Sequence, residues 1–202
     1  MSLPVYFIAA FFLGAIPNAY LAGRLLKGID IRQHGSGNVG ATNVFRVLGK
    51  GPGSAVFALD FMKGALPVLL LPFFSAASHH PQLMRLAAGL CAVLGHMFTP
   101  FLKFKGGKGV ASGAGAVCAA FPWLFLVAFV AWVIVFYFSR IVSLSSLASV
   151  SALYAAAVYT HPADPWTRRV FLGMLILVFW SHRSNLRRLI KGDEPSFSKT
   201  NK

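Results

Sequence analysis

Long apolar runs are the feature of this sequence that most limits its fold. Of the 202 residues, 56% are hydrophobic and only 12% are charged, and the apolar residues are gathered in runs rather than alternating with polar ones. A soluble domain needs more charged surface than this, whereas each helix that crosses a bilayer needs ~20 mostly apolar residues. The sequence therefore predicts an all-α, polytopic membrane bundle that forms a single domain over residues 1–202.

Seven apolar runs are counted as membrane spans. They cover residues 4–26, 53–77, 83–102, 110–121, 122–138, 144–160 and 170–182, the last with a start nearer Trp166 left open. The fourth run is short, but its Gly, Ala and Ser residues suit a helix that packs closely against its neighbours. The first run has no basic residue before it, which favours a retained span over a cleaved signal peptide.

Basic residues test this count because they gather on the cytoplasmic side of membrane proteins. With seven spans and the N-terminus outside, one side receives all but three of the 19 Lys and Arg residues, the exceptions being Arg85, Arg168 and Arg169. We therefore predict that the N-terminus lies outside and that the C-terminus is cytoplasmic.

The first unusual stretch on the cytoplasmic side is "RQHGSGNVGATNVFRVLGKGPG", residues 32–53. Its glycines alternate with polar residues, a spacing in which backbone N–H groups can form an anion-binding nest. The candidate site residues of this segment are Ser36, Asn38 and Gly40, and Gly35 and Gly37 complete the glycine spacing. The alternative is a flexible loop whose basic residues touch lipid head groups.

A short helix is predicted to follow these glycines, from Ala41 onward. Asn43 and Arg46 are three residues apart and would share one face of it. The N-terminus of this helix would point back at the glycines, which favours an anion there.

The second stretch is "LKFKGGKGV", residues 102–110, which is not a nucleotide-binding P-loop. Gly109 rather than Ser or Thr follows Lys108, and Leu102 stands where that motif needs its first Gly. A glycine-rich loop that bears lysines and runs into a helix still favours phosphate. The candidate residues are Lys105, Gly106, Gly107, Lys108 and Gly109. The alternative is a simple cytoplasmic anchor of lysines.

Histidines near the ends of two runs are further candidates. His96, close to the end of the third run, could face the same site, although such a residue is more often a packing residue. In the third stretch, "HRSNLRRLIKGDE" at residues 182–194, His182 and Asn185 are three apart on one helical face. Arg183 and Arg187 form another stripe that could meet lipid phosphates.

The acidic residues and cysteines exclude several kinds of chemistry. There are only five carboxylates, with no set that would hold a metal and no evident catalytic pair, so neither a metal nor a cofactor is predicted. Asp60 and Lys63, three residues apart, are expected to pair with each other. Cys91 and Cys118 lie inside apolar runs and are expected to be small buried residues.

The three stretches together resemble the signatures of one bacterial membrane family. "GSGNVGATNVFRVLG", "GHMFTPFLKFKGGKGVA" and "HRSNLRRLIKGDE", in this order, are similar to those of the acyl-phosphate-dependent glycerol-3-phosphate acyltransferases, the PlsY family. The resemblance spans the whole chain. It implies an enzyme that transfers a fatty acyl group from acyl phosphate to the 1-hydroxyl of glycerol 3-phosphate, the first acylation of phospholipid biosynthesis. The products would be lysophosphatidic acid and phosphate.

The resemblance also implies the donor substrate, the cellular location and the partners of this chain. The family does not use acyl-CoA or acyl carrier protein as donor. Membership would make this chain a multi-pass protein of the bacterial inner membrane with a cytoplasmic active site. The bilayer is its expected surrounding, nucleic acid is not an expected partner, and a transient contact with the enzyme that makes acyl phosphate is left open.

Residue roles follow from the resemblance. The motif residues Ser36, Asn38, Asn43 and Arg46 would line the active site, the lysine–glycine loop would hold the phosphate of glycerol 3-phosphate, and His182 and Asn185 would orient substrate. Glu194 would steady the fold of the tail.

Chemically, Lys108 or Arg46 would neutralise the leaving phosphate, and the Ser36 hydroxyl would help to hold the oxyanion. Two bases for the acceptor hydroxyl stay open: His182 and a substrate phosphate, whose second pKa is ~6.

A membrane transporter of anions or phosphate esters is the alternative function. A bundle of seven spans with a basic site suits it. The basic loops, however, gather on one side, and no inverted repeat or second, outward site is evident in the sequence.

Overall fold

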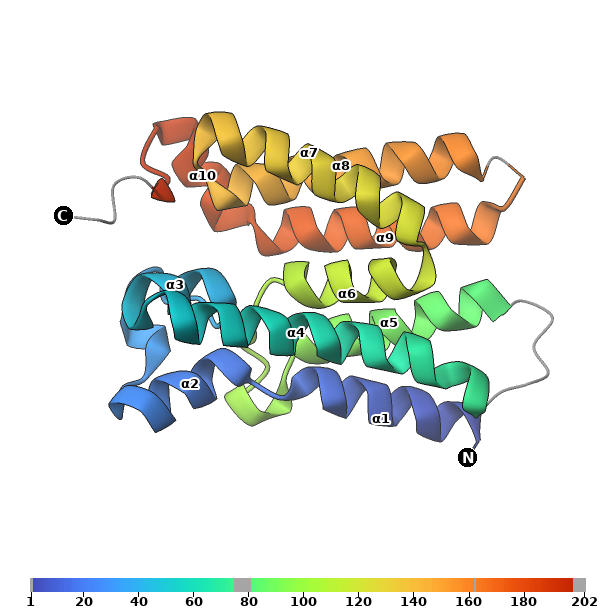
Figure 1. Cartoon of the computed structure of the whole chain (residues 1–202), viewed down its shortest axis with the longest axis horizontal. Helices are drawn as coiled ribbons and strands as arrows, with labels where there is room; N and C mark the ends of the chain where they lie inside the picture. Colours follow the sequence, from blue (N-terminus) through green and yellow to red (C-terminus); the bar gives the residue numbers. More distant parts are fainter. Residues whose placement is uncertain (1, 75–80, 162, 198–202) are drawn as a thin grey trace. The chain divides into compact units, whose positions relative to one another are not determined.

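The computed structural model describes residues 2–74, 81–161 and 163–197, and Figure 1 shows their helices. Within these ranges the regular structure is helical, and no strand occurs. The helices form two compact units, Met1–Ala120 and Phe121–Lys202.

The first unit is built around four helices that lie side by side, α1, α4, α5 and α6 (Figure 1). Its α-helices are α1 (Leu3–Ala15), α2 (Asn18–Lys27), α3 (Ala41–Leu48), α4 (Lys50–Leu70), α5 (Pro81–Met97) and α6 (Val110–Ala120). Short 3₁₀ turns join them: η1 (Ile31–Gln33), η2 (Leu71–Phe73) and η3 (Pro100–Leu102). α1 packs on α5, and α4 packs on both α5 and α6.

Glycines set the close approach of α4 to α6. A Cβ atom at Gly64 would lie 1.9 Å from the carbonyl oxygen of Ser112, and one at Gly115 would lie 1.9 Å from the carbonyl oxygen of Phe61. Only residues without a side chain let two helix backbones come this near. The expectation that the short, small-residue run packs tightly is therefore confirmed.

The first predicted run is interrupted in the structure. Residues 4–26 were expected to form one span, but the helix breaks between α1 and α2 at Ile16 and Pro17, where Ile16 has φ −57° and ψ 117°. Proline lacks an N–H and disfavours helical geometry in the residue before it, so a break here has a local cause.

Buried side chains satisfy the carbonyl groups that this break exposes. Thr99 Oγ1 donates to the Ala15 carbonyl at 2.6 Å, and Lys63 Nζ donates to the Ile16 carbonyl at 2.8 Å. Lys63 Nζ also lies 2.9 Å from Asp60 Oδ1, which confirms the predicted pairing of these two residues.

The second unit contains α7 (Pro122–Ser139), α8 (Val142–Thr160), α9 (Pro165–Ser181) and α10 (Arg183–Lys191). α7 packs against α8 and α8 against α9, with Leu147, Val150 and Val178 in the core between the last two. The Asp164 carboxylate accepts hydrogen bonds from the backbone N–H groups of Trp166 and Thr167, so α9 begins with a side-chain cap.

Five stretches of the described chain are long and apolar enough to cross a membrane. They are Leu3–Lys27, Lys50–Phe73, Pro81–Leu102, Pro122–Ser139 and Val142–Thr160. α6, with 11 residues, and α9, with 17, are shorter. Large apolar side chains are exposed on α7, including Phe129 and Phe138, as expected of a helix that faces lipid.

Candidate active site

Asn43 of α3 holds the loop that precedes this helix. Its side chain is almost fully buried, and Nδ2 donates to the carbonyl oxygens of Ile31 at 3.1 Å and His34 at 3.0 Å. Its Oδ1 accepts the backbone N–H of Ser36 at 2.8 Å. The three bonds satisfy backbone groups that would otherwise be costly to leave unpaired.

The loop conformation requires glycine at position 35. Gly35 has φ +60°, and a Cβ atom there would lie 2.3 Å from Asn43 Oδ1. The same bonds change the predicted role of the neighbouring amides. The Ser36 N–H is bound by Asn43, and the Gly37 N–H donates to the His34 carbonyl at 3.1 Å. These two amides therefore have partners within the first motif in this structure, and the predicted anion nest stays a prediction.

The short helix after these glycines begins where the sequence predicts. Gly40 precedes α3, whose start at Ala41 agrees with the expected helix. The Ser36 side chain is exposed, and Asn38 is half-buried beside Gly40. A cluster of buried apolar residues fixes the motif to its surroundings: Ala19, Ile31, Val39, Ala41, Val44, Val56 and Leu102.

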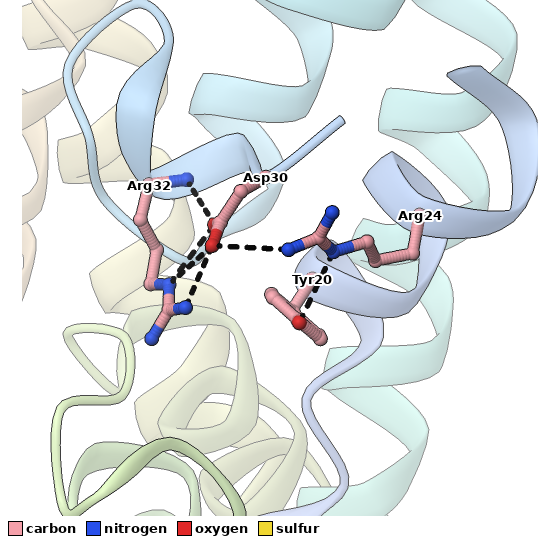
Figure 2. Close-up of polar contacts among 4 residues, drawn as sticks. All are labelled: Tyr20, Arg24, Asp30 and Arg32. Carbon is pink, nitrogen blue, oxygen red and sulfur yellow. Dashed lines mark hydrogen bonds and ion pairs between the residues drawn. The ribbon is translucent and has the colours of Figure 1, made fainter. Parts of the chain in front are cut away.

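An acidic residue that the sequence analysis did not select fixes the start of this loop. Figure 2 shows the Asp30 carboxylate between the guanidinium groups of Arg24 and Arg32. Arg32 Nη2 lies 2.6 Å from Asp30 Oδ2, and Arg24 Nη2 lies 3.5 Å from the same oxygen. Hydrogen bonds from Arg32 lower the pKa of Asp30 to about 2. Tyr20 adds to the cluster, since both guanidinium groups lie over its ring.

The lysine–glycine loop folds back onto the end of α5. The Gly106 N–H donates to the Met97 carbonyl at 3.0 Å, and the Gly107 N–H donates to the His96 carbonyl at 3.1 Å. These bonds satisfy carbonyl groups that a helix end leaves without partners. The amides of Gly106 and Gly107 therefore bind α5 in this structure.

The first two motifs meet at Gly107. A Cβ atom there would lie 2.1 Å from Nε2 of His96 and 2.7 Å from the carbonyl oxygen of Val39. His96 is buried, and Val39 belongs to the first motif. Because any larger residue would collide with both, this glycine marks the point where the two loops touch.

The loop then turns directly into α6. Gly109 has φ +79°, a conformation that favours glycine, and the helix begins at Val110. Lys108 immediately precedes this turn and is half-buried, whereas Lys105 is exposed. The first amides of a helix have no partner within it, and they favour an anion at this end.

The third motif belongs to the second unit. His182 is buried, and its Nδ1 lies 2.8 Å from the Val178 carbonyl oxygen. Because a carbonyl can only accept, Nδ1 carries a proton in this contact.

Glu194 joins α8 and α10 of the second unit. Ser143 Oγ donates to Oε1 at 2.7 Å, Asn185 Nδ2 donates to the same oxygen, and Arg188 Nε donates to Oε2 at 2.7 Å. Burial alone would raise the pKa of Glu194, but these donors outweigh it and lower the pKa. The expectation that Glu194 steadies the tail agrees with these contacts.

Comparison with known proteins assigns the chain to a family. The family model described as glycerol-3-phosphate acyltransferase matches residues 4–192. This chain belongs to the glycerol-3-phosphate acyltransferase family. The glycerol-3-phosphate acyltransferase of Bacillus subtilis is 42% identical over 195 residues, covering 96% of this chain and 97% of the relative. That of a Synechocystis strain is 40% identical over 196 residues, covering 93% and 87%.

Solved structures of a family member agree with this. A crystal structure of PlsY, an integral membrane glycerol 3-phosphate acyltransferase in its glycerol 3-phosphate form, matches with a TM-score of 0.88 and 37% identity, covering 98% of this chain and 96% of that one. The lysophosphatidic acid form matches with a TM-score of 0.84 and 36% identity. The present acyltransferase is accordingly an integral membrane protein with multiple helical spans.

Within this acyltransferase, the structure groups the candidate residues by unit. The first unit holds Ser36, Asn38, Gly40, Asn43, Arg46, His96, Lys105, Gly106, Gly107, Lys108 and Gly109, and the second holds His182 and Asn185. Sequence reasoning missed Asp30 and Thr99, although the Arg24–Asp30–Arg32 charge pattern could have indicated the first.

Proposed function

We propose that this acyltransferase takes its acyl group from acyl phosphate and transfers it to the 1-hydroxyl of glycerol 3-phosphate. The products are lysophosphatidic acid and inorganic phosphate, and the reaction is the first acylation of phospholipid biosynthesis. The observation that carries the proposal is the lysine–glycine loop, which runs into α6 and touches the first motif at Gly107. A glycerol 3-phosphate form and a lysophosphatidic acid form of a structurally similar protein support it.

The proposed topology has seven spans in the bacterial inner membrane. α6 and α9 complete the five longer stretches, the N-terminus lies outside, and the C-terminus and the active site face the cytoplasm. The placement of the Lys and Arg residues supports this, since only Arg85, Arg168 and Arg169 would lie outside. Both units then act as one acyltransferase domain, surrounded by lipid and in transient contact with the enzyme that supplies acyl phosphate.

Lys108 and the N-terminus of α6 bind the phosphate of glycerol 3-phosphate in this proposal. Lys108 stands directly before the Gly109 turn, and the first amides of α6 add donors at the same end. Lys105, from its exposed position, adds positive charge. Gly106, Gly107 and His96 support this loop from the side of α5, as their contacts indicate.

Arg46 and Ser36 serve the acyl phosphate. Acyl phosphate is already activated, so transfer needs no nucleotide, and Arg46 or Lys108 neutralises the phosphate that leaves. The Ser36 hydroxyl stabilises the oxyanion that develops on the acyl carbonyl. Asn38 and Gly40 shape this part of the site, and Asn43 fixes Ser36 through its backbone N–H.

The acceptor hydroxyl loses its proton to a phosphate group of the substrates rather than to His182. A phosphate with a second pKa of ~6 is a competent base near neutral pH. The third motif contributes His182 and Asn185, which orient substrate.

The test is an assay of purified protein in detergent with palmitoyl phosphate and labelled glycerol 3-phosphate, without nucleotide or metal. We expect labelled lysophosphatidic acid, and little or none when palmitoyl-CoA replaces palmitoyl phosphate. Since detergent removes all compartments, product formation also excludes transport as the sole function. Equal product from both donors, or none from palmitoyl phosphate, would contradict the proposal.

A further inference from the structure

A buried ionic cluster lies behind the lysine–glycine loop, in the first unit. Asp60 and Lys63 of α4 are 1% and 4% exposed. Asp60 Oδ1 lies 2.9 Å from Lys63 Nζ, accepts a hydrogen bond from Asn18 Nδ2 at 3.0 Å, and lies 3.8 Å from Nδ1 of His96. One carboxylate oxygen thus contacts side chains from α2, α4 and α5.

Structural stability alone is a weak reason for such a cluster in a membrane-spanning helix. Placing charges in the apolar interior is costly, and replacing a buried ion pair by apolar residues is often neutral or stabilising. Ionisable groups within a span therefore suggest a functional role. The mechanism proposed above uses neither Asp60 nor Lys63.

His96 connects this cluster to the loop. Its Nδ1 faces Asp60, while its Nε2 faces Gly107 so closely that a Cβ atom there would lie 2.1 Å away. The backbone carbonyl of His96 also accepts the Gly107 N–H at 3.1 Å. A rotation of the imidazole ring would therefore change its packing against Gly107 of the loop.

We propose that Asp60, held by Lys63 and Asn18, is a positioning residue that sets the lysine–glycine loop through the imidazole of His96. Asp60 does not touch substrate. It orients the ring against which Gly107 packs, and this fixes the path of the loop to Lys108 and α6. The inference rests on the proposed function, in which this loop binds the phosphate of glycerol 3-phosphate.

The first variant is Asp60→Asn/Lys63→Met, which removes the orienting carboxylate and keeps the charge balanced. It also removes the hydrogen bond from Lys63 to the Ile16 carbonyl, so the difference between the two substrates, and not stability, is the readout. We expect the KM for glycerol 3-phosphate and the Kd for it, from equilibrium dialysis in detergent, to rise about tenfold, or about 1.4 kcal/mol. The KM for palmitoyl phosphate should stay within about twofold, since a change confined to the loop acts on one substrate. A folded double variant with the wild-type KM and Kd for glycerol 3-phosphate would overturn the inference. Asp60 and Lys63 would then have a purely structural role.

Asn18→Ala provides the test if the double variant does not fold. It removes one hydrogen bond to Asp60 and alters no charge. The KM for glycerol 3-phosphate should rise about threefold, the scale of one hydrogen bond, with the KM for palmitoyl phosphate unchanged. An unchanged KM for glycerol 3-phosphate, or an equal rise for both substrates, would contradict the inference.

Tyr6→Phe is the matched control. It removes a buried hydrogen bond from Tyr6 to the Pro67 carbonyl, in the same unit but at the opposite end of α1 from Asn18. Both constants should stay at the wild-type value, while thermal unfolding reports the loss of the bond. The wild-type assay distinguishes a failure of the proposed function from a failure of this inference. Wild-type enzyme that makes no lysophosphatidic acid counts against the proposed function, whereas an active wild type with unaffected variants counts against this inference alone.

Discussion

In the first unit, the segments at residues 31–48 and 99–109 are held by hydrogen bonds to backbone carbonyl and amide groups. Asn43 binds two carbonyls and one amide, and Gly106 and Gly107 bind the end of α5. In the second unit, the turn after α10 is held by the charged carboxylate of Glu194, which takes donors from three side chains. The Asn43 and glycine bonds in the first unit thus join neutral groups, whereas the turn after α10 depends on one ionised group.

Gly107→Ala is expected to have the largest effect on activity. The added methyl group would collide with the His96 ring and the Val39 carbonyl, at the contact of the two loops. We expect kcat/KM to fall by about 100-fold or more, the cost of a misplacement near 1 Å. Gly51→Ala, where a Cβ atom would meet nothing within 4 Å, is the control and should stay near the wild-type value. Equal activity of the two variants would show that the contact is unimportant.

Asn43→Ala is expected to rank second. It leaves three backbone groups of the first motif without their partner, each at a cost of roughly 1–3 kcal/mol where buried. We expect a clear loss of thermal stability and a fall in kcat/KM of about 10-fold to 100-fold, because Ser36 loses its support. Asn43→Asp keeps an acceptor for the Ser36 N–H, so its thermal stability and kcat/KM should lie between those of the wild type and of Asn43→Ala.

The control for position 43 is Gln33→Ala, an exposed residue of the same segment. Gln33→Ala should change neither the thermal stability nor kcat/KM. Wild-type activity in Asn43→Ala would mean that the first loop does not need this clamp.

Glu194→Gln tests the charged arrangement of the second unit. The amide keeps the shape of the side chain but loses the charge opposite Arg188, so we expect unfolding about 3–6 °C lower at pH 7. The pKa of Glu194 is lowered on folding, so its stabilisation is present above the ordinary carboxyl pKa of ~4.3 and is lost as the pH falls through the lowered value.

Thermal unfolding of wild type and Glu194→Gln between pH 7 and pH 3.5 measures this dependence. The two curves should converge at the acid end. A difference that stays constant over the whole range would show that the charge of Glu194 is not what holds the turn.

His182→Gln should have the smallest effect. If a substrate phosphate is the base, kcat falls by no more than about threefold and its pH profile does not shift, whereas a lost general base costs typically 10²–10⁴-fold. A large fall in kcat with a changed acidic limb would make His182 the base and would remove that part of the proposal.

The helices could be predicted from the sequence because apolar runs report directly on burial and lipid contact. The fourth and fifth runs agree with α6 and α7 to within a residue or so at each end. Local chemistry misled the prediction at the start of α4. The second run was predicted to begin at residue 53, but the helix begins at Lys50, since a first helical turn does not need the N–H that Pro52 lacks.

The site was less predictable because its contacts join residues far apart in the chain. Glycine spacing correctly indicated unusual backbone at Gly35 and Gly37, but the direction of the Asn43 side chain decides which amides are occupied. The contact of His96 with Gly107 depends likewise on how the loop folds back on α5, and no local pattern contains that information.

In the proposed mechanism, the lysine–glycine loop (residues 102–110) binds the phosphate of glycerol 3-phosphate. The most direct test compares Lys108→Ala with Lys103→Ala, an exposed lysine of the same loop, for the KM of glycerol 3-phosphate in detergent. We expect the KM of glycerol 3-phosphate to rise about 10-fold to 100-fold for Lys108→Ala, because one charged contact to phosphate is lost, and to change little for Lys103→Ala. Equal constants for both variants would contradict it.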